Sequence, residues 1–385
     1  MDFGITKEQE QLRQEVRAFV EKEVTPEVVR ETELADGLGQ ASWEFLRKAG
    51  ARGWLTPAWP REYGGLDGTH TDKLIIVEEF ARHAAPDILV GSGMAGPTIL
   101  LFGSDEQKKE FLPRIASGEI EFALGYTEPH AGSDLASLEI RAVEDGDYYV
   151  INGQKMFNTA CHFAQYHWLG ARTDPDAPKH QGVSLFIVDM KSPGITVRPL
   201  WTLADWRTNE VYYDDVRVPK KNLVGQKNRG FYHIATALDF ERIFPIGGMQ
   251  RNFEKVMAYA RETKREGQIL SKDPVFRQKA AEIALELNIA RLLSYRVAWI
   301  QDTGTVPNYE SSMLKMFATE LWQRMYEVAM ETTGLYGQLK AGSKWAPLDG
   351  KLEHFYRFGP IETVVAGSSE IMRGVIAMRG LGLPR

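Results

Sequence analysis

The chain has 385 residues, with 46 Lys and Arg against 52 Asp and Glu, so its formal net charge is -6. This mildly acidic balance argues against a nucleic-acid-binding surface, and no run of about 18 apolar residues predicts a transmembrane helix. The single Cys161 excludes an internal disulfide, and the histidine spacing gives no metal motif. Because the polar N-terminus lacks signal-peptide features, we expect a cytoplasmic protein.

Residues 1–120 are predicted to be helical. Apolar residues recur every third or fourth position in Leu12–Val24 and in Leu74–Ala81, which is typical of amphipathic helices, and Thr71-Asp72 is a candidate N-cap for the second stretch. A turn-rich connection, Pro57–Gly68, separates them. We interpret this part as scaffold and pocket wall.

Between residues 121 and 225 the pattern changes to short strands separated by turns. Strands are predicted at 122–124, 140–143, 148–151, 166–171, 184–188, 196–199 and 210–213. Their regular spacing favours a small barrel or sandwich. The segment Thr173–Gln181 has loop composition and is expected at the surface.

Beyond residue 226 the chain is again predicted to be helical. Ala280–Ile300 carries apolar residues at helical spacing, and four long antiparallel helices fit the segment, with an apolar excess suited to packing between subunits. The expected fold is therefore α+β and mainly α. It comprises an N-terminal helical domain (1–120), a central small β-barrel (121–225) and a C-terminal four-helix bundle (226–385).

Two short motifs in the central segment carry the functional signal. Gly125–Asp134 (GYTEPHAGSD) runs from an apolar strand into a turn that can present backbone N–H groups and hydroxyls to a flat, phosphate-bearing group. Ile151–Thr159 (INGQKMFNT) contains an Asn-Gly pair that predicts a two-residue hairpin between two strands. That hairpin places Phe157 and Thr159 at a strand end, where an aromatic ring and a hydroxyl suit a flavin. Each motif alone also fits an ordinary turn.

Together and in this order, the motifs resemble those of the acyl-CoA dehydrogenase family, which read TEPxAGSD and INGxKxW/F-x-T. Further matching landmarks lie at 64–65, 214–219, 238–242 and 367–373, so the resemblance covers nearly the whole chain. It implies an FAD enzyme that oxidises a coenzyme A thioester to its 2,3-enoyl form, with beta-hydride transfer to flavin N5. It further implies that electrons pass to an electron-transferring flavoprotein and that the chain forms tetramers with active sites near subunit boundaries.

The resemblance also assigns site residues. Thr127 and Thr159 are expected to hydrogen-bond the isoalloxazine, and Phe157 to pack on its face, although Phe157 could instead be plain core. The complete cofactor-binding set is Leu124, Tyr126, Thr127, Gly132, Ser133, Phe157, Thr159, Ser368 and Glu370. The substrate-binding set is Ser133, Asp239, Arg242, Ala366 and Gly367.

Oxidation of the thioester begins with removal of its alpha proton, which needs a base whose pKa is raised towards neutrality. The position that many family members use for this glutamate holds Ala366 here. A branch that resembles isovaleryl-CoA and long-chain dehydrogenases carries the base on a helix with the pattern LDxER, present here as 238–242. Glu241 is therefore the predicted base, although the ordinary role of a glutamate next to an arginine is a surface salt bridge. Glu362 is the alternative base, but we interpret it as part of a helix surface.

The helix that carries Glu241 is expected to bend. Pro245 cannot donate to the carbonyl four residues earlier, so it should kink the helix and turn Glu241 to the acyl chain. Asp239 and Arg242 would then face the coenzyme A arm, with a structural ion pair between them as the other interpretation.

The sequence departs from the family where a neighbouring subunit usually completes the flavin site. Thr263 and Glu266 stand where the motif has Arg and Phe, and Glu331 replaces Gln, which puts a carboxylate near phosphates. Either Arg261 or Arg265 replaces the missing Arg, or a different polypeptide supplies the contact, so a homotetramer and a heterotetramer with a homologue both stay open. The departures also motivate the alternative of a largely non-catalytic partner subunit of a heteromeric enzyme, and a flavin acyl-CoA oxidase is a further alternative.

The acyl group is not readable, but the space freed near Ala366 favours a branched, bulky or long one. Small residues at Gly91, Gly93, Ala95 and Gly96 either line the far end of an acyl tunnel or form a close helix–helix contact.

Overall fold

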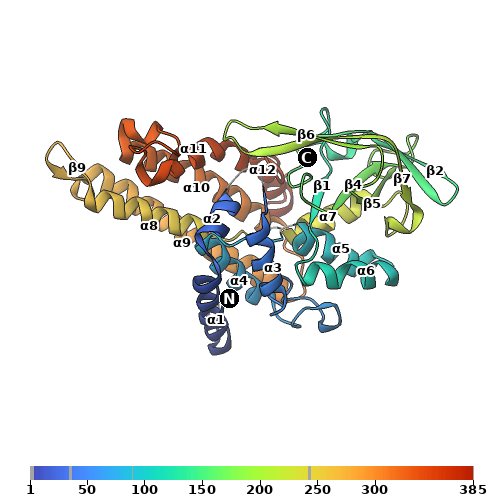
Figure 1. Ribbon diagram of the computed structural model, residues 1–385, viewed down its shortest axis with the longest axis horizontal. Helices are drawn as coiled ribbons and strands as arrows, with labels where there is room; N and C mark the ends of the chain where they lie inside the picture. The colour runs from blue at the N-terminus through green and yellow to red at the C-terminus, as the bar shows by residue number, and fades with distance from the viewer. Residues whose placement is uncertain (1–3, 34–36, 89, 242–243, 385) are drawn as a thin grey trace.

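The structure is a computed structural model that describes residues 4–33, 37–88, 90–241 and 244–384, with the backbone alone for residues 236–241. Helices dominate, and one β domain lies at the right-hand end of the view in Figure 1. The predicted class, mainly α with a β domain between two helical regions, is confirmed. The domain boundaries at 120/121 and 225/226 stay a prediction. No described helix is both long enough and apolar enough to cross a bilayer.

Helices make up the N-terminal region. They are α1 (Lys7–Glu23), α2 (Pro26–Glu33), α3 (Gln40–Gly50), α4 (His70–His83), a π-turn (Gly91–Ala95), α5 (Gly96–Phe102) and α6 (Asp105–Ala116). Of these, α1, α4 and α6 begin with a capping box. The N-cap of α4 is Thr69 rather than the predicted Thr71, because the Thr69 hydroxyl accepts the Asp72 N–H and the Asp72 carboxylate accepts the Thr69 N–H. The prediction of a threonine cap was therefore correct in residue type, but the cap lies two positions earlier in the chain.

A buried acid joins this region to the β domain. The Oε1 atom of Glu121 accepts the N–H of Gly91 and the N–H of Phe122, both at 2.6 Å, and so ties the π-turn to the first strand. Burial raises the pKa of Glu121 to about 8 against the opposing effect of these backbone hydrogen bonds. The folded protein therefore holds a proton that the unfolded chain releases above pH 4.5.

Glu121→Gln is expected to flatten the pH dependence of stability. In the wild type the folded state binds the extra proton between pH 4.5 and about 8, so stability falls as pH rises through that window and is level above it. The Gln side chain keeps the carbonyl oxygen that accepts both N–H groups but does not titrate. Thermal midpoints from pH 5 to 9 measure the effect, and equal slopes for the two proteins would contradict it.

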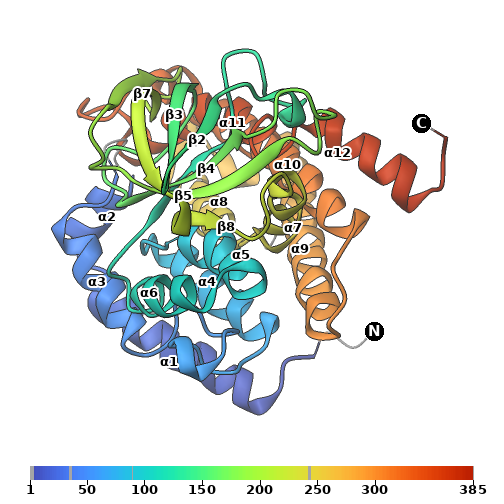
Figure 2. The ribbon, with the colours of Figure 1, turned by 90° about the vertical axis from the view of Figure 1, so that its right-hand side faces the viewer.

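The central strands form one eight-stranded sheet. They are β1 (Phe122–Gly125), β2 (Arg141–Asp145), β3 (Tyr148–Lys155), β4 (Tyr166–Arg172), β5 (Val183–Asp189), β6 (Ile195–Trp201), β7 (Arg207–Pro219) and β8 (Leu223–Val224). The pairing order is β6-β7-β3-β2-β4-β5-β8, and β1 pairs in parallel with β4. In the described residues β6 and β8 do not pair with each other, so the hydrogen bonds themselves do not close a ring. Figure 2 shows the sheet stacked on the N-terminal helices.

The predicted hairpin at Asn152-Gly153 is wrong, because β3 continues through both residues. The pairing of β3 with β7 shifts register there as a β-bulge, and the Asn152 amide exchanges two hydrogen bonds with Asp215 on β7. Gly153 has a φ of +141°, and a Cβ on it would lie 2.8 Å from Ile140, so glycine serves the bulge. The true two-residue turn, between β2 and β3, contains Gly146.

The C-terminal region is a helical bundle, as expected. Its helices are α7 (Gly230–Glu241), α8 (Gly247–Glu262), α9 (Pro274–Asp302), α10 (Tyr309–Thr333), α11 (Lys351–Glu362) and α12 (Ser369–Val375). A small hairpin of β9 (Lys264–Arg265) and β10 (Gln268–Ile269) lies at the far tip of the bundle (Figure 1). The predicted kink at Pro245 is instead a full interruption, since α7 ends at Glu241 and α8 begins at Gly247.

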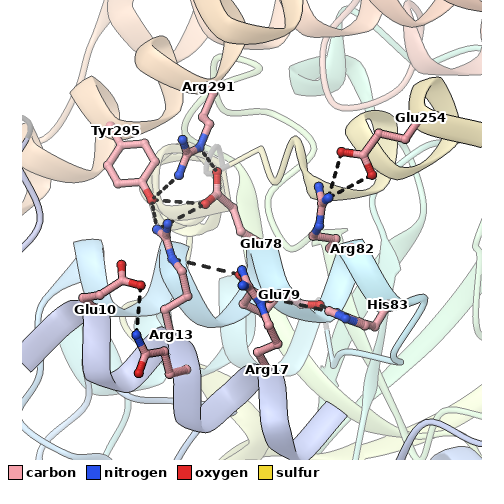
Figure 3. Close-up of polar contacts among 11 residues, drawn as sticks. Glu10, Arg13, Arg17, Glu78, Glu79, Arg82, His83, Glu254, Arg291 and Tyr295 are labelled. Carbon is pink, nitrogen blue, oxygen red and sulfur yellow. Dashed lines mark hydrogen bonds and ion pairs between the residues drawn. The ribbon is translucent and has the colours of Figure 1, made fainter. Parts of the chain in front are cut away.

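Charged side chains join α1, α4 and α9 at the start of α8 (Figure 3). The Glu78 carboxylate on α4, which is 6% exposed, accepts from Tyr295 at 3.1 Å and from Arg291 at 3.3 Å, and lies 3.8 Å from Arg13. These contacts surround a cavity of about 380 Å³. Gly247 packs against this face of α4, where a Cβ would lie 2.3 Å from the Glu78 carbonyl oxygen. The N-terminal region and the bundle are thus one packed body at this point.

Candidate active site

The two sequence motifs meet at the end of β1. The Met156 N–H donates to the Thr127 carbonyl at 2.9 Å, and the Asn158 side-chain amide donates to the Leu124 carbonyl at 2.7 Å. Asn158 is itself buried, and its backbone N–H donates to the Asn209 carbonyl on β7 at 2.9 Å. Leu124 and Thr127 are half-buried and Tyr126 is buried. The structure therefore brings the two motifs together, although Glu128 of the first motif and Lys155 of the second are 27 positions apart in the sequence.

Phe157 has an unusual backbone conformation. Its φ is +58°, in the left-handed region that aromatic residues seldom adopt, and its side chain is 55% exposed. The exposed Thr159 follows, and its hydroxyl donates to the Thr208 hydroxyl at 3.3 Å. Phe157 is therefore not core, and its aromatic surface is available to a planar ligand.

The turn of the first motif is open on its outer side. Gly132 and Ser133 are exposed, and a Cβ on Gly132 would meet no atom within 4 Å. Next to them, Asp134 pairs with Lys179 at 2.8 Å, so the surface loop 173–181 lies against this turn. A cradle with open space at its glycine and an exposed hydroxyl fits the phosphates of a dinucleotide.

A buried ion pair beneath the cradle was missed in reading the sequence. Lys155 on β3 is 0% exposed, and its Nζ lies 2.8 Å from Oε1 of Glu128. Desolvation lowers the pKa of Lys155 to about 8 against the opposing charge of Glu128. The signal was present, because Lys155 has the same strand parity as the buried Tyr149 and Ile151, so alternation places it on the inner face.

The predicted base lies at the end of α7. Glu241 is its last residue, and the side chains of Glu241 and Asp239, like the whole of Arg242, lie outside the described residues. The chain beyond is anchored where Ser294 of α9 donates to the Phe244 carbonyl at 2.8 Å. The helix also packs on the π-turn, on α5 and on β5. Helix α7 as a whole thus contacts both the β domain and the N-terminal helices.

The small residues before α5 have different roles. Cβ atoms on Gly91 and Gly96 would lie 3.0 Å from Glu121 and 2.0 Å from Trp59, so those two glycines allow close packing. Gly93 is equally buried, yet a Cβ there would meet nothing within 4 Å. The π-turn therefore has unfilled space at Gly93, on an element that contacts α7.

The C-terminal motif forms a left-handed turn into α12. Ala366 and Gly367 have φ of +54° and +92°, and Ala366 is exposed. The Ser368 hydroxyl accepts the Ile371 N–H as the N-cap of α12, and Glu370 is exposed in its first turn. Lys315 holds this turn from α10 through hydrogen bonds to the carbonyls of Glu362 and Gly367, at 2.9 and 2.8 Å.

The alternative base, Glu362, is half-buried rather than on a helix surface. Desolvation raises its pKa to about 7, while the charge of Lys315 opposes the rise. Its charge also acts on the buried Tyr326, whose hydroxyl accepts from Asn252 on α8 at 2.7 Å. Glu362 is the last residue of α11, and its backbone carbonyl accepts from Lys315 of α10.

The departures from the family motif gather at the far tip of the bundle. Thr263 ends α8, and Glu266 lies in the turn between β9 and β10 with φ +52°. Glu331 pairs with Lys279, and Arg265 donates to the Thr332 carbonyl at 2.8 Å. All of these residues except Thr263 border a cavity of about 410 Å³. Carboxylates stand here where the family places flavin-binding groups, and they are exposed or paired with lysine.

Comparison with known proteins covers the whole chain. The families described as acyl-CoA dehydrogenase N-terminal, middle and C-terminal domains match residues 6–119, 123–216 and 228–381. The chain is 37% identical to acyl-CoA dehydrogenase FadE26 and 39% identical to acyl-CoA dehydrogenase FadE29, both of Mycobacterium tuberculosis (strain ATCC 25618 / H37Rv), across 100% of this chain and 99% of each relative.

Solved structures give the same result. The Tcur3481-Tcur3483 steroid ACAD superposes with a TM-score of 0.92 at 36% identity, and the ChsE4-ChsE5 complex from Mycobacterium tuberculosis with 0.91 at 37% identity. Both alignments cover 100% of each chain. The paired flavin-loop motifs, the fold around them and these full-length matches show that the chain belongs to the acyl-CoA dehydrogenase family of oxidoreductases.

Proposed function

We propose that the protein binds FAD and oxidises an acyl-CoA thioester to the 2,3-enoyl-CoA. The observation that carries the proposal is the platform formed by the two motifs, where Phe157 is exposed in a strained conformation beside the open turn at Gly132 and Ser133. Thr127 and Thr159 would hydrogen-bond the ring, and the turn would hold the pyrophosphate. Ser368 and Glu370 would serve the adenine half.

The chain's own residues supply the proton chemistry. Glu241 would take the alpha proton of the thioester from its place at the last position of α7. Asp239 and Arg242 would bind the coenzyme A arm, with Ser133, Ala366 and Gly367 along the thioester. A bound flavin supplies the hydride acceptor for such chemistry. Glu362, at the end of α11, is the alternative base.

The substrate we propose carries a bulky acyl group. Two observations support it: the buried space at Gly93 beside α7, and the absence of a carboxyl side chain at Ala366. A structural relative is called a steroid ACAD, which makes steroid acyl-CoA thioesters a reasonable class to test. Anaerobic bleaching of bound flavin by a panel of short, long, branched and steroid acyl-CoA thioesters tests both activity and class. A flavin-loaded protein that no thioester bleaches would contradict the proposal.

A heteromeric assembly is a second candidate that the far tip of the bundle favours. Lys279 engages Glu331, and Glu266 is exposed, so this tip is poorly suited to a neighbouring flavin's phosphates. Two relatives of known structure, the Tcur3481-Tcur3483 steroid ACAD and the ChsE4-ChsE5 complex, each have a name that lists two components. We infer that a homologue completes the flavin site, in place of a homotetramer. The alternative in which this chain is a largely non-catalytic partner predicts that flavin and activity belong to the homologue.

Flavin stoichiometry separates these assemblies. We expect colourless or flavin-poor protein when the chain is purified alone. When the chain is co-expressed with a homologue that carries the missing Arg and Phe, we expect about one flavin for each pair of this chain and the homologue. Stoichiometric yellow homotetramer from the single chain would contradict the heteromeric assembly. The proposed acceptor is an electron-transferring flavoprotein in the cytoplasm, and oxygen consumption without added acceptor would favour the oxidase instead.

A further inference from the structure

Lys155 holds the flavin loop from below through two acceptors. Its Nζ donates to the Tyr126 carbonyl and to the Glu128 carboxylate, each at 2.8 Å. These acceptors lie on either side of Thr127, whose own carbonyl accepts the Met156 N–H at 2.9 Å. Three successive loop residues are therefore bound to the end of β3, and the backbone at Thr127 cannot shift without breaking one of these hydrogen bonds.

Glu128 closes the same loop at its other end. Its carboxylate accepts the N–H of Glu139 at 2.7 Å and the N–H of Ile140 at 3.0 Å, so the turn with Gly132 and Ser133 begins and ends at one buried group. Glu128 is 3% exposed. A pair this deeply buried adds little net stability over apolar side chains of similar volume, because desolvation offsets the attraction. The specific effect of the ion pair is a fixed geometry of the loop.

We propose that the Lys155–Glu128 ion pair positions the cofactor. The pair holds Thr127 and the open turn at Gly132 and Ser133 at a fixed distance from β3, and Phe157 lies just beyond the end of that strand. The inference rests on the proposed function, since it concerns the residues proposed to hold FAD. Lys155 is fully enclosed, so it is a positioning residue and not a catalytic residue.

The test compares Lys155→Met with the double variant Glu128→Gln/Lys155→Met, each in the flavin-loaded assembly. The single variant is expected to weaken FAD binding at least about 10-fold and to lower turnover about 10²-fold, the scale of a displacement near 1 Å. The double variant removes the uncompensated buried carboxylate, so its thermal midpoint should recover while its FAD affinity stays low. If FAD affinity recovers together with the thermal midpoint, the pair is only structural and the proposal is overturned.

Lys179→Met is the matched control, because Lys179 on the neighbouring loop 173–181 forms an ion pair with Asp134 at the end of the same turn, but the two side chains are 52% and 57% exposed. It should leave FAD affinity within about 2-fold of the wild type. Hydrogen exchange of residues 126–140 in flavin-free protein needs no cofactor and should rise in both variants that lack Lys155 but not in Lys179→Met. If wild-type protein binds no flavin in any assembly, the proposed function fails, whereas exchange unchanged by Lys155→Met overturns the positioning role itself.

Discussion

Replacing Glu241 with Gln is expected to lower kcat by about 10²–10⁴-fold, the contribution of a general base placed at the reacting proton. The amide matches the carboxylate in size, so flavin content and acyl-CoA binding should stay close to those of the wild type. Stopped-flow reduction of the bound flavin by the best thioester measures the proton-removal step directly. The loss should appear in that step rather than in reoxidation by the acceptor.

Glu362→Gln is the matched control for this experiment. Burial raises the pKa of Glu362 to about 7, which suits a base, but the proposed mechanism assigns proton removal to Glu241. Flavin reduction should therefore proceed at a rate within a few-fold of the wild type. The reverse result, with Glu241→Gln active and Glu362→Gln inactive, would move the base to α11 and reject the role proposed for the LDxER helix.

Glu78→Gln is expected to destabilise the junction of α1, α4 and α9 by about 3 kcal/mol, at the low end for removal of one partner from a buried charge network. The change leaves Arg13 and Arg291 close together without the carboxylate that both approach (Figure 3). Hydrogen exchange of α1 and α4 measures the local free energy of opening, which a whole-chain midpoint does not isolate in a large protein.

Glu254→Gln provides the comparison for that measurement. Glu254 pairs with Arg82 on the same side of α4 at 2.8 Å, but its side chain is 60% exposed. Solvent screens this pair, so the expected loss is about 1 kcal/mol or less. Equal losses for the two variants would show that burial of Glu78 adds nothing to the junction.

Prediction from sequence succeeded where the signal was local. Each of the seven predicted strands overlaps an observed one, and Ala280–Ile300 lies inside α9, because strand and helix periodicities depend on neighbouring residues alone. It failed at Asn152-Gly153. The dipeptide permits a turn or a bulge, and the choice depends on pairing with Asp215, 63 residues away.

The sequence by itself determined the family, the order of the elements and the two motifs, since these reside in residue types at short spacing. Only the tertiary structure decided that Lys155 and Glu128 meet beneath the turn of Gly125–Asp134, that Phe157 is exposed in a strained conformation, and that burial raises the pKa of Glu121. Each of these depends on which distant groups exclude water from a side chain. Desolvation and pairing are properties of the packed chain, and spacing along the sequence does not contain them.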